Sequence, residues 1–519
     1  MLKIHQVYTE IDEKLNREHI AAKLRCPPSD IISFKIDRQS LDARHCELRY
    51  SYSVFAEVKR QEKYLRRKDV AEGNEEKYIL PEKTVMPERP VVAGFGPAGM
   101  FAALILAECG CCPVVIERGR PVEQRTEDVE RFFKEGILDP ESNVQYGEGG
   151  AGTFSDGKLT TRIKNHRIRK VLEEFVEAGA SPEIMYQAMP HLGTDQLVGI
   201  VKNIREKIIR LGGEVRFETK AQRIVISQGK LSGVETSRGM IECTDLIAAL
   251  GHSARETYES LLACGIEIFQ KDFAAGIRVE HPQEMINRNQ YGKFSGSPGL
   301  PAASYRLAFK ASSGRGVYSF CMCPGGIVIP ASTEEGMLAV NGMSYSGRSG
   351  NNANSAILVQ IPRRDFDHGH PLDGYVFQSE LEKRAWRRKY QAPSQNIADY
   401  LKNRKTESPV WASSYPRGNV WEDMHGLFSE EVNLSLAEAF SDFDRRIPGF
   451  ITQGIMVGME SRSSSPIRME RDERGVSISC SGLYPCGEGA GYAGGIVSSA
   501  VDGIRQAENL IANYRSGRK

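Results

Sequence analysis

The spacing of apolar residues divides this 519-residue chain into regions with different periods. The first region combines alternating apolar and polar positions, typical of strands with one buried face, with one short helical stretch. The expected strands are Ile4–Tyr8, Ile31–Ile36 and Cys46–Val58, and the expected helix is Glu18–Leu24. We predict a small α+β cap over residues 1–75 and a linker over 76–89. The charged segment Asp37–Arg44 is either a plain connection between strands or an interface loop.

From residue 90 onward, short and fully apolar runs alternate with longer helical stretches. This pattern is typical of a parallel sheet whose strands are buried on both faces and joined by helices. The expected strands end at Val92, Ile116 and Leu250, and Glu214–Glu218 is expected to pair with Ala221–Ser227; the expected helices are Met100–Glu108, Val122–Lys134, 167–179 and 195–211. We therefore predict an α/β fold with a Rossmann-like domain that begins with residues 90–270.

Glycine, serine and asparagine become more frequent after residue 270, and the apolar runs become shorter. This change indicates a mixed α+β domain inserted over residues 271–455. We expect this domain to form the substrate pocket. Its expected strands are Gly276–Glu280, Val317–Cys321, Gly326–Pro330 and Leu338–Gly342, and its expected helices are Asn396–Leu401 and Leu434–Phe443. The strand Leu483–Cys486 and the helix Ile496–Tyr514 then return the chain to the first domain over 456–519.

Three glycine-rich segments carry the candidate chemistry. Gly94, Gly96 and Gly99 follow a strand and open a helix in G-x-G-x-x-G spacing, which suits a pyrophosphate at the helix N-terminus. Glu117 lies 18 residues past Gly99, where a carboxylate would accept ribose hydroxyls. The segments 147–158 and 482–495 offer further backbone without bulky side chains, suited to contact with a flat ligand. The helix that starts at Ile496 would direct its positive end at that ligand.

Composition and charge argue against several classes of protein. The formal net charge of +1 gives no general attraction to nucleic acid or membranes, and no apolar run is long enough for a membrane span. The basic runs at 59–68 and 383–389 are expected to lie on solvent-exposed faces of the protein. The eleven cysteines lack the spacing of a disulfide framework or of zinc ligands, which favours a cytoplasmic protein. A second G-x-G-x-x-G segment is missing, which disfavours a reductase with a separate NAD(P)H domain.

The three segments together resemble a known family. The chain resembles the uncharacterised FAD-dependent dehydrogenases of bacteria, a group of NAD(P)/FAD-dependent oxidoreductases. The resemblance lies in residues 91–99 with Glu117, in the run Gly149–Leu159 and in the run Cys486–Ile496. The segments Ser319–Gly326 and Glu460–Ile467 match that group too. The resemblance spans nearly the whole chain and implies FAD in a fold like that of glutathione reductase. In that class a final Gly-Asp pair binds the ribityl chain, whereas this chain has Gly487-Glu488. The longer acid suggests that the backbone of Gly487 and Gly495 makes this contact.

The residues expected to contact the cofactor come from these segments and from the ends of nearby strands. They are Gly94, Gly96, Pro97, Ala98, Gly99, Glu117, Arg118, Gly150, Ala151, Gly152, Thr153, Ser155, Asp156, Gly157, Ala221, Gln222, Ala249, Leu250, Gly251, Gly487, Glu488, Gly494, Gly495 and Ile496. We expect no metal ligand among them.

No catalytic residue is decided by the sequence, because a flavin carries the redox step itself. His252 and His281 are candidate proton donors or satisfied structural histidines. Cys321 and Cys323 share one face of a strand and are too close for a relaxed disulfide in extended backbone. One of them is a candidate thiol near the flavin, with two small core residues as the alternative. Arg278, Arg348 and Arg462 are candidate clamps for an anionic substrate or salt-bridge partners, and Tyr345 lies with Asn351 and Asn352 on a candidate gating loop.

These features predict an FAD-dependent oxidoreductase that transfers a hydride between a small organic substrate or NAD(P)H and N5 of the flavin. Two alternatives stay open: a tRNA-modifying flavoprotein, supported only by the basic runs, and a flavin-bound redox sensor or scaffold without enzymatic activity. The sequence does not determine the substrate, the direction of electron flow or the oligomeric state.

Overall fold

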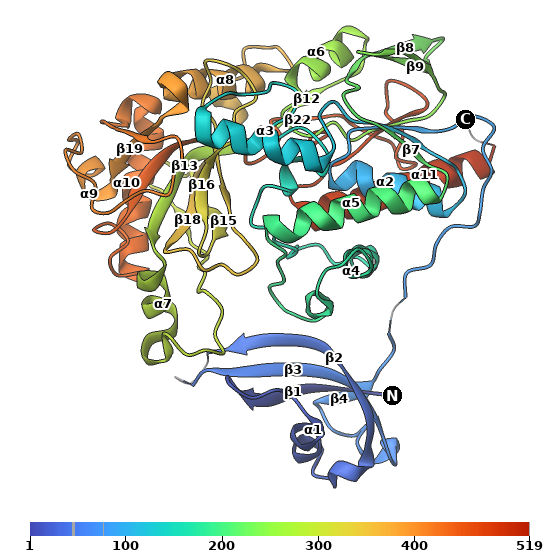
Figure 1. Ribbon diagram of the computed structural model, residues 1–519, viewed down its shortest axis with the longest axis vertical. Coiled ribbons are helices and arrows are strands. Elements are labelled where there is room, and N and C mark those ends of the chain that lie inside the picture. Colours follow the sequence, from blue (N-terminus) through green and yellow to red (C-terminus); the bar gives the residue numbers. More distant parts are fainter. Residues whose placement is uncertain (44–46, 76, 518–519) are drawn as a thin grey trace.

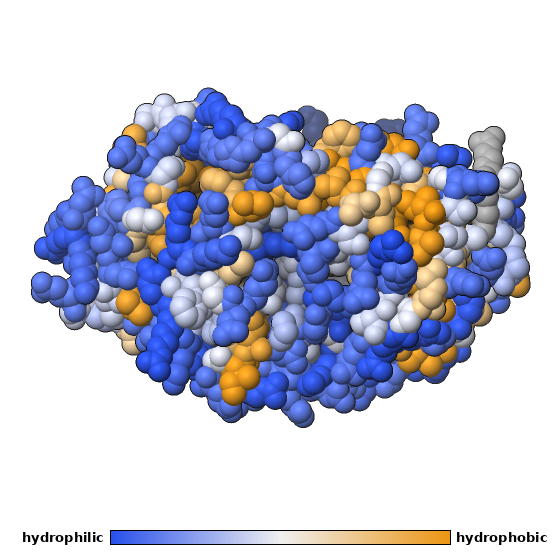
Figure 2. All heavy atoms as spheres, turned by 90° about the horizontal axis from the view of Figure 1, so that it is seen from above, coloured by the Kyte–Doolittle hydropathy of each residue, from blue (hydrophilic) through white to orange (hydrophobic). Residues whose placement is uncertain are grey.

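The computed structural model describes residues 1–43, 47–75 and 77–517. Figure 1 shows three parts: an N-terminal domain at the bottom, a domain with a central parallel sheet, and a domain built on a larger mixed sheet. Among the described residues, none of the helices combines the length and the apolar character that crossing a bilayer requires. The face seen from above is mainly hydrophilic and carries separate apolar areas (Figure 2).

The N-terminal domain is a four-stranded antiparallel sheet in the order β2-β3-β1-β4, with one helix. Its own core includes Ile4, Ile20 and Val54. It contacts the other domains through hydrogen bonds from the Gln39 N–H to the Tyr186 carbonyl and from the Tyr50 hydroxyl to the Gly299 carbonyl. The elements are β1 Leu2–Glu10, α1 Arg17–Leu24, β2 Ile31–Asp42, β3 Arg49–Val58 and β4 Val70–Glu72.

The expected cap is therefore present, but one connection differs from the prediction. β2 continues to Asp42, so most of the charged segment expected to be a loop is strand paired with β3. The rest of the expected connection and the start of the strand predicted from Cys46 lie partly outside the described residues. The edge position of β2 explains its polar composition, because most of its residues are exposed or half-buried, although its outer edge bonds to residues 186–188 at Gln39.

The second domain has a five-stranded parallel sheet in the order β23-β11-β5-β6-β7. Val92 and Val115 face a layer of helices, and Val91 and Val114 face a three-stranded antiparallel sheet and α6. Both faces are thus buried, which explains the uninterrupted apolar runs. The strands are β5 Val91–Ala93, β6 Val114–Ile116, β7 Glu214–Arg216, β11 Leu246–Ala248 and β23 Leu483–Pro485; the helices are α2 Pro97–Glu108, α3 Val122–Glu135, α4 Arg167–Glu177, α5 Thr194–Arg210, α6 Arg255–Ala263 and α11 Ile496–Arg515.

One prediction for this domain is wrong in detail. The segment at Glu214 does not pair with Ala221–Ser227: it is β7 of the parallel sheet, whereas the other is β8 of the antiparallel sheet. The helix α2 is buried on all sides from Ala98 to Ala107, because α11 and α5 cover the side that does not face the sheet. The antiparallel sheet consists of β8 Ala221–Ser227, β9 Lys230–Thr236 and β10 Gly239–Glu242.

The third domain is built on a seven-stranded sheet in the order β14-β15-β18-β13-β21-β19-β20. Its core includes Ile357 of the sheet and Phe440 of α10, which lies beside it in Figure 1. The strands are β13 Phe273–Pro282, β14 Ala308–Lys310, β15 Gly316–Cys323, β18 Asn352–Ile361, β19 Ala392–Asn396, β20 Asn419–Trp421 and β21 Ile455–Glu460, with the hairpin β16 Ile327–Pro330 and β17 Val340–Met343; the helices are α7 Gln283–Tyr291, α8 Asp373–Ala385, α9 Ile397–Tyr400 and α10 Glu430–Arg446.

The third domain ends later than predicted. β21 is hydrogen-bonded between β13 and β19, so the predicted boundary after residue 455 cuts through this sheet. The short pair β12 Phe269–Gln270 and β22 Ile467–Arg468 then joins the two crossings between the second and third domains. The double connection places the loops of both domains against each other, and the candidate site lies there.

Candidate flavin and thiol site

The first glycine-rich segment makes the turn from β5 to α2. Gly94 has a φ of +95°, and a Cβ there would lie 2.3 Å from the Ala249 carbonyl oxygen, so this position requires glycine. A Cβ at Gly99 would lie 1.9 Å from the Gly94 oxygen, which shows how closely the helix approaches the strand. Gly96 is the N-cap of α2 and supplies no capping side chain. The first N–H groups of α2 are therefore left to bind an external acceptor.

Glu117 joins the first segment to the second. Its Oε2 accepts from the Phe95 N–H at 2.8 Å, and its Oε1 accepts from the N–H groups of Gly119 and Gly147 at 2.9 Å each. The side chain is 5% exposed. Because a carboxylate has about four lone-pair directions, these three bonds leave room for one further donor such as a ribose hydroxyl. Glu117 thus fixes the loops around the expected cofactor position as well as offering an acceptor to it.

The second glycine-rich segment lies between the two helix N-termini. A Cβ at Gly150 would lie 2.9 Å from the Gly96 Cα, and one at Gly152 would lie 3.1 Å from Cγ1 of Ile496 at the start of α11. Arg125 of α3, which the sequence analysis did not identify, fixes the backbone of this segment. Its fully buried guanidinium donates to five carbonyl oxygens, those of Asn143, Val144, Gly147, Glu148 and Gly150.

The third segment completes the convergence. A Cβ at Gly487 would lie 2.8 Å from the Ala98 Cβ, and the Gly487 N–H donates to Asp502 at 2.8 Å. α11 packs on α2 so closely that a Cβ at Gly503 would lie 2.0 Å from the Ala98 oxygen. Gly495 caps α11 without a side-chain hydrogen bond. Three segments far apart in sequence therefore meet at two helix N-termini, as the sequence analysis expected.

The predicted contacts at the far end of this site also lie together. Ala221, Gln222 and Leu250 line a narrow hollow with Ala248 and Thr257. Arg118 next to it is committed to other partners: its guanidinium lies 3.8 Å from the Tyr146 ring centre and pairs with Glu141 and Glu256 at 2.6 and 2.7 Å. These contacts hold the Arg118 side chain in place beside the hollow.

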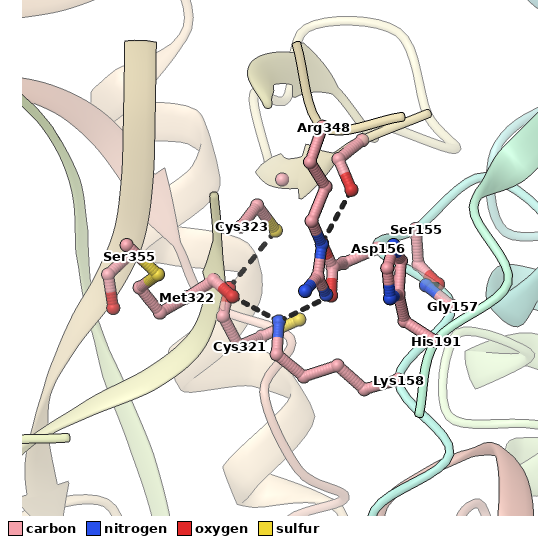
Figure 3. Close-up of polar contacts among 12 residues, drawn as sticks. Ser155, Asp156, Gly157, Lys158, His191, Cys321, Met322, Cys323, Arg348 and Ser355 are labelled. Atoms are coloured by element: carbon pink, nitrogen blue, oxygen red, sulfur yellow. Dashed lines mark hydrogen bonds and ion pairs between the residues drawn. The ribbon is translucent and has the colours of Figure 1, made fainter. Parts of the chain in front are cut away.

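Asp156 and Lys158, from the end of the second segment, form an ion cluster with the third domain (Figure 3). Lys158 Nζ lies 2.7 Å from Asp156 Oδ2 and also donates to the Met322 carbonyl. Arg348 pairs with the same carboxylate, and the Ser344 hydroxyl donates to it. Burial raises the pKa of Asp156, but Lys158 and Arg348 outweigh this and hold it below the usual range. Of the candidates, Cys321, Cys323 and Arg348 are brought together here.

Comparisons with known proteins agree with this site. Residues 272–463 match the family described as FAD-dependent protein, C-terminal domain-like, and residues 1–57 match a domain of unknown function, DUF8436. An uncharacterised protein of Clostridium beijerinckii is 45% identical over 527 residues, which cover 99% of each chain. The chain belongs to the family of this Clostridium protein. The match to the FAD-dependent family lies within the third domain.

The solved structures that are similar to this chain are distant relatives. Glycine oxidase from Bacillus cereus ATCC 14579 is 12% identical, with 82% of this chain and 95% of that chain covered and a TM-score of 0.32. L-proline dehydrogenase from P. horikoshii is 12% identical, with 85% and 95% covered and a TM-score of 0.35. Likenesses of this size carry no weight for the fold or the activity.

The residues present fit FAD. A Cβ at Gly96 would meet only Gly150 Cα, at 3.7 Å, so the space beside the N-terminus of α2 is open. The first turn of α2 after Pro97 and the first turn of α11 from Ile496 have no side-chain cap, so their N–H groups can bind phosphates and an electron-rich ring edge. When bound, FAD supplies a centre that accepts or donates two electrons. The chain's own part is to bind it through backbone groups and to orient a substrate beside it.

His252, the candidate proton donor after β11, lies in a separate polar pair. Its Nε2 is 3.1 Å from Gln378 Oε1, and the Gln378 amide donates to the Ser461 carbonyl. Nε2 is therefore the donor, and Nδ1, 3.7 Å from Glu488 Oε1, faces the third glycine-rich segment. His281 is different: it is fully buried with Nε2 2.8 Å from the Phe450 carbonyl oxygen, so it is a structural histidine.

Two of the three candidate arginine clamps are occupied within the protein. Arg278 is fully buried and bonds to Glu460, Asn341, Asn354 and the Cys321 carbonyl. Arg462 pairs with Glu382 at 2.7 Å. Arg348 is also paired, but its side chain is 11% exposed at the edge of the ion cluster. Tyr345 on the same loop is 57% exposed.

Proposed function

We propose that this protein is an FAD-dependent oxidoreductase that transfers a hydride between N5 of the flavin and a small organic substrate or NAD(P)H. The meeting of three glycine-rich segments at the N-termini of α2 and α11 carries this proposal. α11 directs its positive end toward the side where Gly152 lies, and such a dipole favours the negative charge of a reduced flavin ring.

The third domain supplies the substrate side of this arrangement. β15 and the loop after β17 bring Cys321 and Arg348 against Asp156 and Lys158 of the flavin-binding segment. Two cations face one buried carboxylate here, so a further anionic group entering beside Arg348 would be attracted. We therefore propose a substrate with a carboxylate or a comparable anionic group, oriented by Arg348.

The basic runs give little support to a tRNA-modifying protein. Arg67 donates to the carbonyl oxygens of Lys23 and Leu24, and Arg387 pairs with Glu422 at 2.5 Å. These side chains are used for packing between elements of the chain, so less of each run is available to bind phosphates. No specific observation favours the tRNA-modifying or the sensor alternative over the oxidoreductase.

The deciding experiment combines an absorbance spectrum of the purified protein with anaerobic additions of NADH and NADPH. We expect a bound flavin that absorbs at about 450 nm. Bleaching by a pyridine nucleotide identifies the electron donor, and bleaching only by an organic substrate from a panel of anionic metabolites identifies a dehydrogenase. A protein that holds no flavin and takes up no added FAD refutes the proposal, and a flavin reduced only by dithionite supports the sensor instead.

Gly96→Ala tests the position of the cofactor. The new methyl group fits the protein, since its nearest neighbour would be Gly150 Cα at 3.7 Å, but it projects beside the phosphate-binding N–H groups. We expect FAD affinity to fall at least tenfold, or about 1.4 kcal/mol, with little loss of fold. Gly199→Ala is the matched control, because Gly199 lies in α5 with nothing within 4 Å of its added Cβ. Equal FAD affinity in both variants would contradict this placement.

A further inference from the structure

The strand that carries the two cysteines is bent at Cys321. Cys321 has a φ of +43°, and the pairing of β15 with β18 shifts register between Phe320 and Cys323. A bulge of this kind turns a side chain away from the alternation of a regular strand. The obstacle to a Cys-x-Cys pair expected from the sequence, an extended backbone, is therefore absent at this position.

The bulge places Cys321 beside a cation. Figure 3 shows its sulfur next to the ammonium group of Lys158, which is fixed by Asp156 and by the Met322 carbonyl. Arg278 lies on the other side: it donates to the Cys321 carbonyl at 2.8 Å and lies 4.0 Å from Cys323 Sγ. The anions that face the pair are Asp156 and Glu460, and each of them is neutralised by one of these cations.

The two thiols differ in state and in accessibility. A hydrogen bond from Cys323 and the charges of Lys158 and Arg278 lower the pKa of Cys321 to about 5, although burial opposes this. The hydrogen bond to Cys321 and burial raise the pKa of Cys323. Cys321 is half-buried, whereas Cys323 is fully buried and donates to the Cys321 carbonyl at 3.2 Å. Cys321 is thus the more readily ionised and the more exposed residue of the two, and Cys323 is shielded.

We propose that Cys321 and Cys323 form a redox-active dithiol beside the flavin site, with Cys321 as the nucleophile and Cys323 as the resolving thiol. The bulge at Cys321 and the fixed ammonium of Lys158 carry this proposal. It adds a second redox centre to the protein and does not depend on the proposed flavin reaction. The chemical class of its partner is a small disulfide that reaches the half-buried Cys321.

The reaction proceeds by two exchanges. The Cys321 thiolate attacks one sulfur of the external disulfide; a mixed disulfide forms, the external S–S bond breaks, and one thiolate leaves. The Cys323 thiol gives its proton to that thiolate and attacks the Cys321 sulfur, which releases the second external sulfur as a thiolate. The external disulfide gains two electrons and the one proton of Cys323, the second external thiolate takes a proton from water, and the dithiol loses two electrons as its own disulfide forms.

The test uses the full-length protein and 4,4′-dithiodipyridine in a stopped-flow instrument, with mass spectrometry of the products. We expect a fast phase that releases two equivalents of thiopyridone and leaves a Cys321–Cys323 disulfide. In Cys323→Ser the fast phase should release one equivalent and leave a thiopyridyl group on Cys321. In Cys321→Ser the fast phase should disappear, while Cys264→Ser, which changes a half-buried thiol in another domain, should keep it.

Lys158→Met tests the cause of the reactivity. Without the ammonium group, the thiolate fraction at pH 7 falls, and we expect the fast phase to slow at least about tenfold, with the difference shrinking above pH 9. Circular dichroism and flavin content, measured on each variant, separate a folding defect from lost chemistry. Release of one equivalent by the wild-type protein, or a fast phase that survives in Cys321→Ser, overturns the proposal whatever the flavin experiments give.

Discussion

Glu382 is the charge on which the contact between the second and third domains depends. This residue of α8 is fully buried and faces Arg255 at the start of α6 and Arg462 just after β21. Its Oε1 accepts from Arg255 at 2.8 Å and from Arg462 at 2.9 Å, and its Oε2 accepts from them at 3.1 and 2.7 Å. The Ser461 hydroxyl donates at 2.6 Å. Two nearly buried guanidinium groups therefore share one carboxylate.

The substitution Glu382→Gln removes the charge and keeps the shape. It leaves two guanidinium groups, 8% and 5% exposed, without their common counter-ion. Removing one partner of a buried ion pair costs about 3–5 kcal/mol, and Glu334, 3.3 Å from Arg255, offsets a part of this. We expect the free energy of unfolding to fall by about 3 kcal/mol. Glu380→Gln on the same helix is the control: its pair with Arg384 is 3.6 Å long and half exposed, so its loss costs less than about 0.5 kcal/mol.

Urea unfolding of the FAD-loaded protein, followed separately by circular dichroism and by flavin release, measures both effects, because a chain of several domains need not unfold in one step. Burial raises the pKa of Glu382, but Arg462 and Arg255 outweigh this and hold it well below the usual range. The stabilisation is therefore complete above the unfolded pKa of about 4.3 and is lost as pH falls below it. The difference between wild type and Glu382→Gln should be constant from pH 6 to 8 and shrink below pH 4. A loss no larger than that of Glu380→Gln would refute the reasoning.

Three further predictions concern single buried side chains. Burial lowers the pKa of His281 to about 4, whereas the unfolded chain binds this proton already near pH 6.5, so acid favours unfolding. The variant His281→Gln cannot bind the proton and should lose up to about 3 kcal/mol less stability than wild type between pH 7 and 4. Urea unfolding at both pH values measures this difference. Arg125→Lys cannot reproduce five bonds to carbonyl oxygens, and flavin retained per protein after gel filtration should fall at least about tenfold. Phe440→Ala empties a fully buried position of α10 and should cost about 3–5 kcal/mol in unfolding free energy.

The sequence predicted best those parts of the fold whose signal is local. The turn from β5 to α2 needs glycine at Gly94, whose φ is +95°, and at Gly99, whose added Cβ would meet the Gly94 oxygen, so its spacing is visible in the chain. β18 was missed because its polar start, Asn352–Ser355, resembles a loop. Asn354 is buried and Asn352 is half-buried, and they bond to Arg278 and Glu280 on the neighbouring strand. A pattern of apolar positions cannot reveal a strand whose core-facing side chains are polar and paired.

The candidate site shows the same limit more sharply. Lys158 belongs to the second glycine-rich segment, which the sequence analysis identified. Its role nevertheless depends on β15, which lies beside it only because the second and third domains pack together. Cys321 and Cys323 were identified as a pair, and extended backbone argued against any reaction between them. One left-handed residue at a bulge reverses that argument, since it changes where the Cys321 side chain points. The reactivity of this dithiol therefore depends on a backbone angle and on a cation from another domain, and Lys158→Met separates the two because it removes the cation and leaves the bulge in place.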